Sequence, residues 1–132
     1  AEYANIPIFS YINTYLNNGV FIDTLIDMEN GKKKAIQNIN VGEKLKNGII
    51  VTGIAHSLHC EETYNYYNEM LNLKGNNLTF EKSNLAKYHK QHVKNNKFNN
   101  KLYHIITDKK YFYIDNVKIY DYNACLEYFL NN

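Results

Sequence analysis

The stretch GVFIDTLIDMENGKKKAIQNINVGEKL, residues 19–45, decides the fold that we expect for this chain. Its first part, Val20–Met28, is rich in β-branched and aromatic residues and is typical of a strand. Glu29-Asn30-Gly31 follows, and these residues tolerate the left-handed backbone of a tight turn. Apolar residues then bring the chain back onto the core at Ala35, Ile36, Ile39, Val41 and Leu45. Taken alone, the stretch predicts a β-hairpin.

The chain beyond this stretch continues the β pattern. Residues 49–56 form a strongly β-branched run, and residues 61–73 read as a strand pair with aromatic packing. Residues 101–108 and 111–119 predict two or three further strands, with a hairpin turn at Asp115-Asn116. Strands and turns alternate without βαβ order, so the pattern predicts an all-β fold.

Two segments do not follow the β pattern. Residues 1–18 predict a short helix that begins near Pro7, with Ile8, Ile12, Tyr15 and Leu16 on one face. Residues 83–100 are rich in Lys, His and Asn and predict an exposed loop or short helix.

Composition narrows the class of protein. The 132 residues are 45% hydrophobic and 21% charged, which is typical of one globular domain. A net charge of +2 is too small to argue for nucleic-acid binding from charge. Cys60 and Cys125 give no disulfide framework and no C-x-x-C pair, and the neighbouring His56 and His59 predict surface histidines rather than a metal pair. No apolar run approaches the roughly 20 residues of a membrane span, so we expect a cytoplasmic protein.

As a whole, residues 19–45 resemble the N-terminal block of inteins and related Hint domains. The matching positions, in order, are Thr24, Leu25-Ile26, Glu29-Asn30-Gly31, Ile36, Ile39, Val41-Gly42-Glu43 and Leu45. The family places a nucleophilic Cys five residues before the Thr, where this chain has Gly19. The prefix Ala1-Glu2-Tyr3 favours a second alternative, in which Ala4 replaces that Cys. The spacing to Thr24 favours Gly19, and both alternatives stay open.

The resemblance assigns further site residues. The family uses a His to bond the scissile amide nitrogen, and the best-matching position here is Asn77, with Asn76 beside it. An Asn donates a hydrogen bond but relays no proton near neutral pH, so His89 or His92 is a candidate substitute. His104 occupies the position where the family usually has an Asp or Cys that tunes the first thiol.

The sequence Tyr122-Asn123-Ala124-Cys125 resembles the downstream splice junction of the family. In the preferred register, Ala124 replaces the terminal Asn, Asn123 takes the penultimate position and Cys125 is the downstream nucleophile. In the other register, Asn123 is terminal and Ala124 replaces the nucleophile.

The resemblance implies protein splicing, a single-turnover reaction through a thioester and Asn cyclisation that needs no cofactor and no metal. It also implies an all-β Hint-type horseshoe of antiparallel strands that brings both junctions together. We expect a flank at 1–18, the Hint domain at 19–124 and a downstream tail at 125–132. Neither Gly19 nor Ala4 has a thiol, and Ala124 has no side-chain amide. We therefore expect an unspliced precursor of a minimal or split-derived intein.

The expected partners are the flanking segments of the chain itself, and a complementary split-intein fragment if the run Lys32-Lys33-Lys34 marks a break between two pieces. Otherwise we expect a monomer that binds neither nucleic acid nor a membrane. Two other functions remain as alternatives. One is a Hint-like autoprocessing domain that cleaves without ligation, and the other is a β-rich module that stacks its many Tyr side chains on nucleic acid.

Overall fold

The computed structural model of the protein describes residues 18–57, 63–69, 71–76, 78–80, 89–93, 101–121, 123–124 and 127. This part of the chain is an all-β structure with antiparallel pairing, as predicted. Its strands are β1 (Gly19–Val20), β2 (Leu25–Asp27), β3 (Lys33–Ala35), β4 (Val51–His56), β5 (Thr63–Tyr67), β6 (Asn72–Asn76), β7 (His89–Val93), β8 (Tyr103–Thr107), β9 (Tyr111–Ile114) and β10 (Val117–Tyr120). Two short 3₁₀ helices, η1 (Ile36–Asn38) and η2 (Lys46–Gly48), follow β3 and precede β4. Across the described ranges, no helix has the length and apolar character that a bilayer crossing needs.

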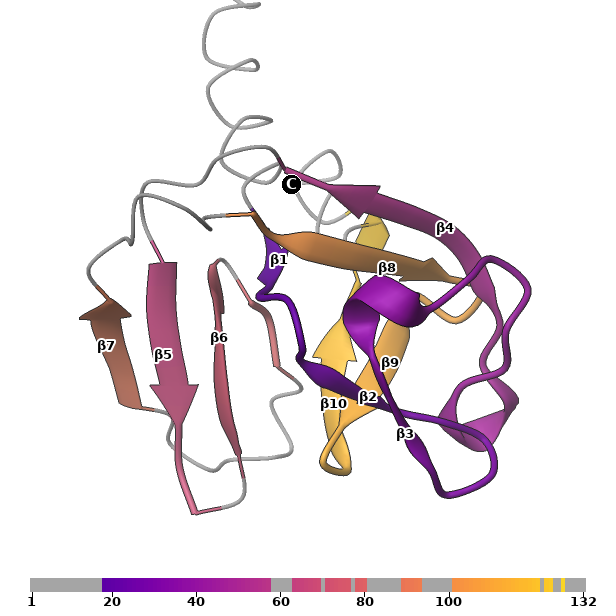
Figure 1. Cartoon of the computed structure of the whole chain (residues 1–132), viewed down its shortest axis with the longest axis horizontal. Helices are drawn as coiled ribbons and strands as arrows, with labels where there is room; N and C mark the ends of the chain where they lie inside the picture. Colours follow the sequence, from indigo (N-terminus) through magenta and orange to yellow (C-terminus); the bar gives the residue numbers. More distant parts are fainter. Residues whose placement is uncertain are drawn as a thin grey trace, which may run out of the picture.

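The largest sheet has six strands in the order β4-β8-β1-β6-β5-β7. Strand β1 lies in its interior, where Gly19 and Val20 pair with Asn76 and Gly75 of β6 and Val20 also pairs with Tyr103 of β8. Figure 1 shows the β7-β5-β6 part at the left and the β8-β4 part at the upper right, with β1 between them. The two-residue strand β1 therefore joins two longer parts of the sheet.

Two separate hairpins, β2–β3 and β9–β10, lie beneath the β4-β8 part in the same view (Figure 1). Their buried side chains share one apolar cluster with the large sheet. Along β9 and β10 every second side chain is buried, as expected for strands with one face on a core. The cluster includes Val20, Ile26, Ile36, Leu45, Ile49, Leu73, Ile105, Phe112, Ile114 and Ile119.

The prediction of one strand across 20–28 was wrong in its middle. The chain turns at Ile22 and Asp23, and Asp23 has a φ of 70°, so β1 and β2 are separate strands. Two hydrogen bonds hold the turn: the Asp23 backbone N–H donates to Gln37 Oε1 at 2.8 Å, and the Thr24 hydroxyl donates to the Phe21 carbonyl at 2.7 Å. The hairpin turn expected at Glu29-Asn30-Gly31 is confirmed.

Lys33 and Lys34 of the lysine run belong to β3 and pair with β2. Lys34 is half-buried, and its Nζ lies 2.8 Å from Glu43 Oε1. The expected loop or helix at 83–100 was also wrong for residues 89–93, which form β7 at the sheet edge. The helix expected near Pro7 lies outside the described residues.

The other strand predictions were confirmed. The run at 49–56 contains β4, residues 61–73 contain β5 and most of the β5–β6 hairpin, and the last third of the chain contains β8, β9 and β10. Asp115 and Asn116 form the two-residue turn between β9 and β10 with φ values of 49° and 66°. These values are those of a type I′ turn, which Asn and Asp tolerate better than most residues.

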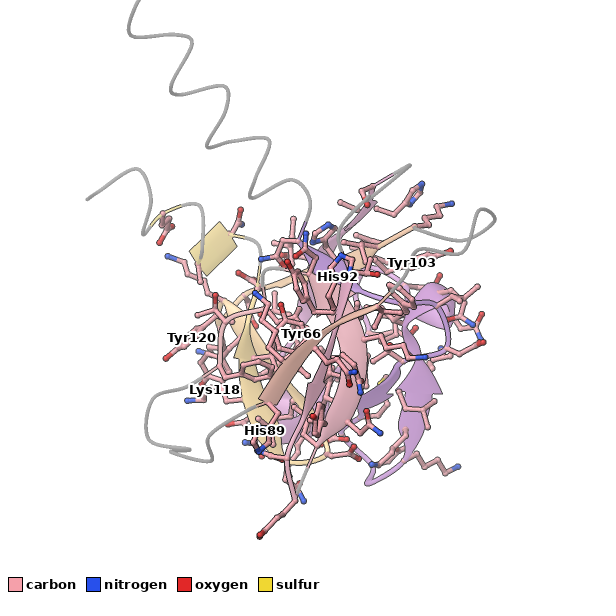
Figure 2. The ribbon with its side chains drawn as sticks, turned by 90° about the vertical axis from the view of Figure 1, so that its left-hand side faces the viewer. Tyr66, His89, His92, Tyr103, Lys118 and Tyr120 are labelled. Atoms are coloured by element: carbon pink, nitrogen blue, oxygen red, sulfur yellow. The ribbon has the colours of Figure 1, made fainter. Side chains whose placement is uncertain are left out.

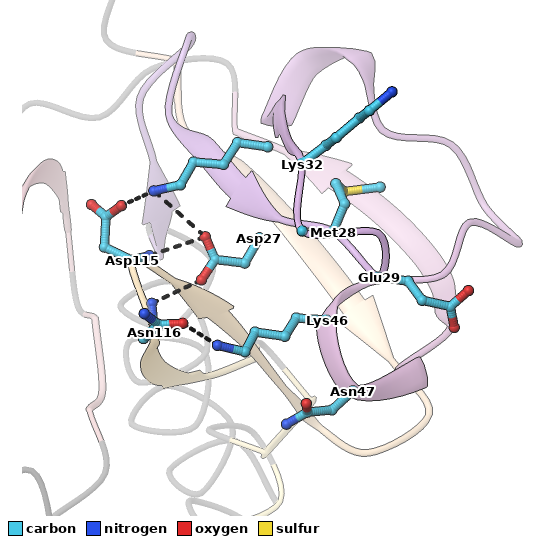
Figure 3. A pocket seen from close by; sticks show the side chains of 10 residues that line it. Asp27, Met28, Glu29, Lys32, Lys46, Asn47, Asp115 and Asn116 are labelled. Carbon is cyan, nitrogen blue, oxygen red and sulfur yellow. Dashed lines mark hydrogen bonds and ion pairs between the residues drawn. The ribbon is translucent and has the colours of Figure 1, made fainter.

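A buried carboxylate joins the two hairpins. Asp27 is 7% exposed, and its two oxygens accept the backbone N–H groups of Asp115 at 3.2 Å and Asn116 at 2.8 Å. Lys33 Nζ lies 3.8 Å from Asp27 Oδ1 and also pairs with the Asp115 carboxylate (Figure 3). Asp27, at the end of β2, thus holds the β9–β10 turn in place.

Replacing Asp27 by Ala should lower the free energy of unfolding by about 2 kcal/mol, because two charge-assisted hydrogen bonds to the turn are lost. The control is Asp108→Ala, since the exposed Asp108 caps a single backbone N–H, that of Ile50, at 3.0 Å. Urea denaturation of both variants measures the difference. Equal losses would show that the Asp27 contact does not stabilise the fold beyond an ordinary surface cap.

Candidate functional site

The two ends of the described domain meet at one small cavity. Its volume is about 10 Å³, room for at most one water molecule. Gly19 enters from β1, His104 from β8 and Asp121 from the residue after β10. The described residues that line it are Asn18, Gly19, Val20, Leu78, Tyr103, His104, Ile105, Phe112, Ile119, Tyr120 and Asp121.

Gly19 is packed so closely that a side chain has no room. A Cβ atom built on Gly19 would lie 2.5 Å from the Tyr103 carbonyl oxygen and 3.1 Å from His104 Cε1. The φ of Gly19 is +145°, a conformation that other residues adopt only with strain. On the other side, a Cβ on Gly75 would collide with the Gly19 carbonyl oxygen. Two glycines therefore permit β1 to pass between β6 and β8.

His104 and Asn76 flank Gly19 on its two neighbouring strands. His104 is 5% exposed and Asn76 is 7% exposed. Asn76 is the direct backbone partner of Gly19 in the β1–β6 pair. The structure thus brings together three residues that the sequence singled out, and it buries all three.

Sequence reasoning missed Asp121, which is 1% exposed. Its Oδ2 accepts the Thr107 backbone N–H at 2.9 Å, and its Oδ1 accepts the Ala124 backbone N–H at 2.8 Å. Burial raises the pKa of this carboxyl above its ordinary value, although the N–H groups of Thr107, Ala124 and Asn123 and the charge of Lys110 oppose the rise. The only signal in the sequence was an acidic residue after an alternating strand, which most often marks a solvated turn.

Ala124 reaches the cavity indirectly, through its hydrogen bond to Asp121. Asn123 and Ala124 have helical backbone conformation, and the Asn123 side chain is exposed. Thr24 does not line the cavity, and its hydroxyl serves the turn after β1 instead. The remaining predicted site residues, Ala4, Asn77 and Cys125, lie outside the described residues, as do His59 and Cys60.

Neither His89 nor His92 is placed to substitute for the missing family His. Both lie on β7, which is separated from β1 by β5 and β6. In Figure 2 the two labels stand toward opposite ends of that edge strand. Their rings contact Tyr67 and Tyr64, with centroids 5.2 and 5.3 Å apart. Of the candidate histidines, His104 is the one beside Gly19.

A larger hollow of about 460 Å³ lies elsewhere, between the turns of the two hairpins and η2 (Figure 3). Several of its polar groups bond one another: Lys33 pairs with Asp27 and Asp115, and Lys46 bonds the Asn116 side chain. These contacts hold the hairpins together. The described side chains that line the hollow do not form a group of nucleophile, acid and base directed at one point. In the part of the chain that the structure describes, no group of three or more His, Cys, Asp or Glu residues could hold a metal ion.

Comparison with models of known protein families gives no match, and no curated protein matches the sequence.

We predict that Gly19→Ala destabilises the fold by more than Gly31→Ala. Both glycines have positive φ, but a Cβ at Gly31 meets nothing within 4 Å, whereas one at Gly19 meets the Tyr103 carbonyl. Gly31→Ala should cost about 1 kcal/mol and Gly19→Ala at least about 2 kcal/mol, because only the second adds a backbone clash to the strain. Chemical denaturation measures both, and equal losses would contradict the close packing of β1.

We also predict a pH signature of Asp121. A carboxyl whose pKa is raised by folding favours the folded state at low pH, and this contribution is lost as pH rises through the folded pKa. The free energy of unfolding of the wild type, minus that of Asp121→Asn, should therefore fall as pH rises above about 4. Denaturation curves from pH 4 upward test this, and a difference that grows with pH would contradict it.

Proposed function

We propose that the chain is a Hint-type autoprocessing domain, which breaks or exchanges a peptide bond at its own flanks. The observation that carries the proposal is the shared cavity: Gly19 from the first strand and Asp121, bonded to Ala124, from the far end both line it. Self-processing needs its two junctions within a few ångströms, since effective molarity then replaces a second substrate. The resemblance of residues 19–45 to the Hint block supports the same function.

The proposed splicing chemistry uses groups of the chain alone. A thiol at the upstream junction would take the acyl group of the preceding residue as a thioester and free its own amine. The downstream Cys125 thiolate would then attack this thioester and release the upstream thiol. Once the downstream bond has broken, the acyl group would move from the Cys125 sulfur to the freed Cys125 amine and form the new peptide bond. At the downstream junction, an Asn side-chain nitrogen attacks its own carbonyl carbon and the C–N bond to the next residue breaks. The attacking nitrogen loses one proton and the released amine gains one, so no oxidant or cofactor is needed.

The groups at the two junctions do not complete this chemistry. Gly19 has no thiol and Ala124 has no side-chain amide, so we propose that the chain is held as an unspliced precursor. His104, whose Cε1 lies 3.1 Å from where a Cβ atom at position 19 would be, is the group that we propose to carry a proton at the upstream junction.

The packing at Gly19 favours the second Hint activity, cleavage without ligation. A thiol-bearing side chain at position 19 would need β1 to move away from Tyr103. Ala124 is half-buried and already carries a Cβ atom. We therefore propose downstream cleavage as the activity that the close packing of β1 opposes least.

The nucleic-acid alternative receives less support from the aromatic residues. Tyr64 and Tyr66 lie on one face of β5, and Lys90 Nζ already stands 4.2 Å from the Tyr64 ring centroid. Tyr67 and His89 stack at the other face. Because the rings are divided between two faces and partly covered, they offer no continuous platform for successive bases.

The decisive experiment restores the downstream amide. Ala124→Asn should release the peptide that begins at Cys125, and mass spectrometry should find it together with a domain that ends in a succinimide. Ala124→Asp is the matched control, because it has the same shape but no nucleophilic nitrogen. Peptide release after Asn123 instead would select the other register.

A second pair of variants separates cleavage from ligation. Adding Ala4→Cys, or Gly19→Cys where denaturation shows that the variant is still folded, to Ala124→Asn should join the two flanks if the domain splices, and should give cleavage alone if it does not. An intact chain in every one of these variants would refute the proposed function.

A further inference from the structure

The segment after β10 is tied to the rest of the fold through Asp121. The Asp121 backbone N–H donates to the Lys110 carbonyl at 2.9 Å, and its Oδ2 accepts the Thr107 N–H. Both partners belong to β8 or to the turn that follows it. Residue 121 is thereby fixed on the same strand that carries His104.

From this fixed point, Asp121 reaches forward along the chain. Its Oδ1 accepts the Ala124 N–H at 2.8 Å, so one carboxylate bridges β8 and the third residue downstream. The Asp121 carboxylate is buried and Ala124 is half-buried, whereas the ion pair of Lys110 Nζ with Glu127, at 2.6 Å, is exposed. An exposed pair contributes little to holding a segment in place, so the buried carboxylate dominates.

We propose that Asp121 is the positioning residue of the downstream junction, which its carboxylate holds at the Gly19–His104 cavity by binding the backbone N–H of residue 124. This proposal rests on the proposed autoprocessing function. Asp121 acts through Ala124 and needs no direct contact with the bond that breaks. Asp121 is only 1% exposed. A carboxylate that is shielded from water binds N–H groups more strongly than an exposed one does.

The first test needs no processing at all. In the chain as it stands, the amide hydrogen of Ala124 should be protected from exchange with solvent, and Asp121→Ala should raise its exchange rate about tenfold or more. Asp121→Asn keeps an oxygen that can accept the Ala124 N–H and should restore much of the protection. A wild-type Ala124 amide that exchanges as fast as a free peptide would overturn the proposal.

The second test uses Ala124→Asn as background. Adding Asp121→Ala should slow release of the downstream peptide about tenfold, since a hydrogen bond that fixes the reacting residue is lost. Asp121→Asn should recover part of the rate. Cleavage that stays as fast with Asp121→Ala would overturn the positioning role alone, whereas no cleavage with Asp121 intact would count against the proposed function itself.

Two control variants distinguish positioning from loss of stability. Asp27→Ala also removes a buried carboxylate that accepts two backbone N–H groups, but Asp27 is not among the residues that line the cavity. It should leave the cleavage rate of the folded protein unchanged. Glu127→Gln removes the exposed pair with Lys110 and should also have no effect. A rate loss with Asp27→Ala equal to that with Asp121→Ala would overturn the proposal.

Discussion

The close passage of β1 between β6 and β8 is the constraint on which the rest of the structure depends. At this point backbone meets backbone, with the Gly19 carbonyl against Gly75 and the Tyr103 carbonyl against Gly19. The backbones approach closely there, and the two-residue strand β1 lies between β6 and β8 in the six-stranded sheet. His104 and Asn76 are buried beside Gly19 as a result of this packing.

Two buried aspartates hold segments of the C-terminal part of the fold in place. Asp27 fixes the β9–β10 turn from the N-terminal hairpin, and Asp121 fixes the residues after β10 from β8. Asp27 accepts two backbone N–H groups of the β9–β10 turn, and Asp121 accepts those of Thr107 and Ala124. The positions of the β9–β10 turn and of the residues after β10 therefore depend on a few polar contacts as well as on apolar packing.

Much of the fold could be predicted from the sequence because its signals are local. The turn at Asp115-Asn116 needs only residues that tolerate positive φ, and the alternation along β9 and β10 needs only one apolar face. The break after β1 could not be predicted, because the Gln37 side chain that holds Asp23 is distant in sequence. Strand β7, HKQHV, is mostly exposed at a sheet edge and carries no apolar alternation.

The candidate site could be predicted only in part, because some of its contacts join residues that are distant in sequence. Gly19, Asn76 and His104 were singled out by a resemblance that covers their neighbourhoods in sequence, and the structure brings them together. Thr24 instead serves a turn. The burial of Asp121 arises from β8 and the turn after it, so no pattern around residue 121 could reveal it.

The shortness of β1 has a dynamic consequence. The β5–β6–β7 ladder is joined to β8 and β4 through the pairs of Gly19 and Val20, with one further bond from the Phe21 N–H to the Lys74 carbonyl. Few backbone bonds hold the ladder at this point, and its attachment depends also on Tyr66, Leu71 and Leu73, which are buried in the common apolar cluster. Local opening of the sheet is therefore expected first at the pairs of Gly19 and Val20, where the fewest backbone hydrogen bonds must break.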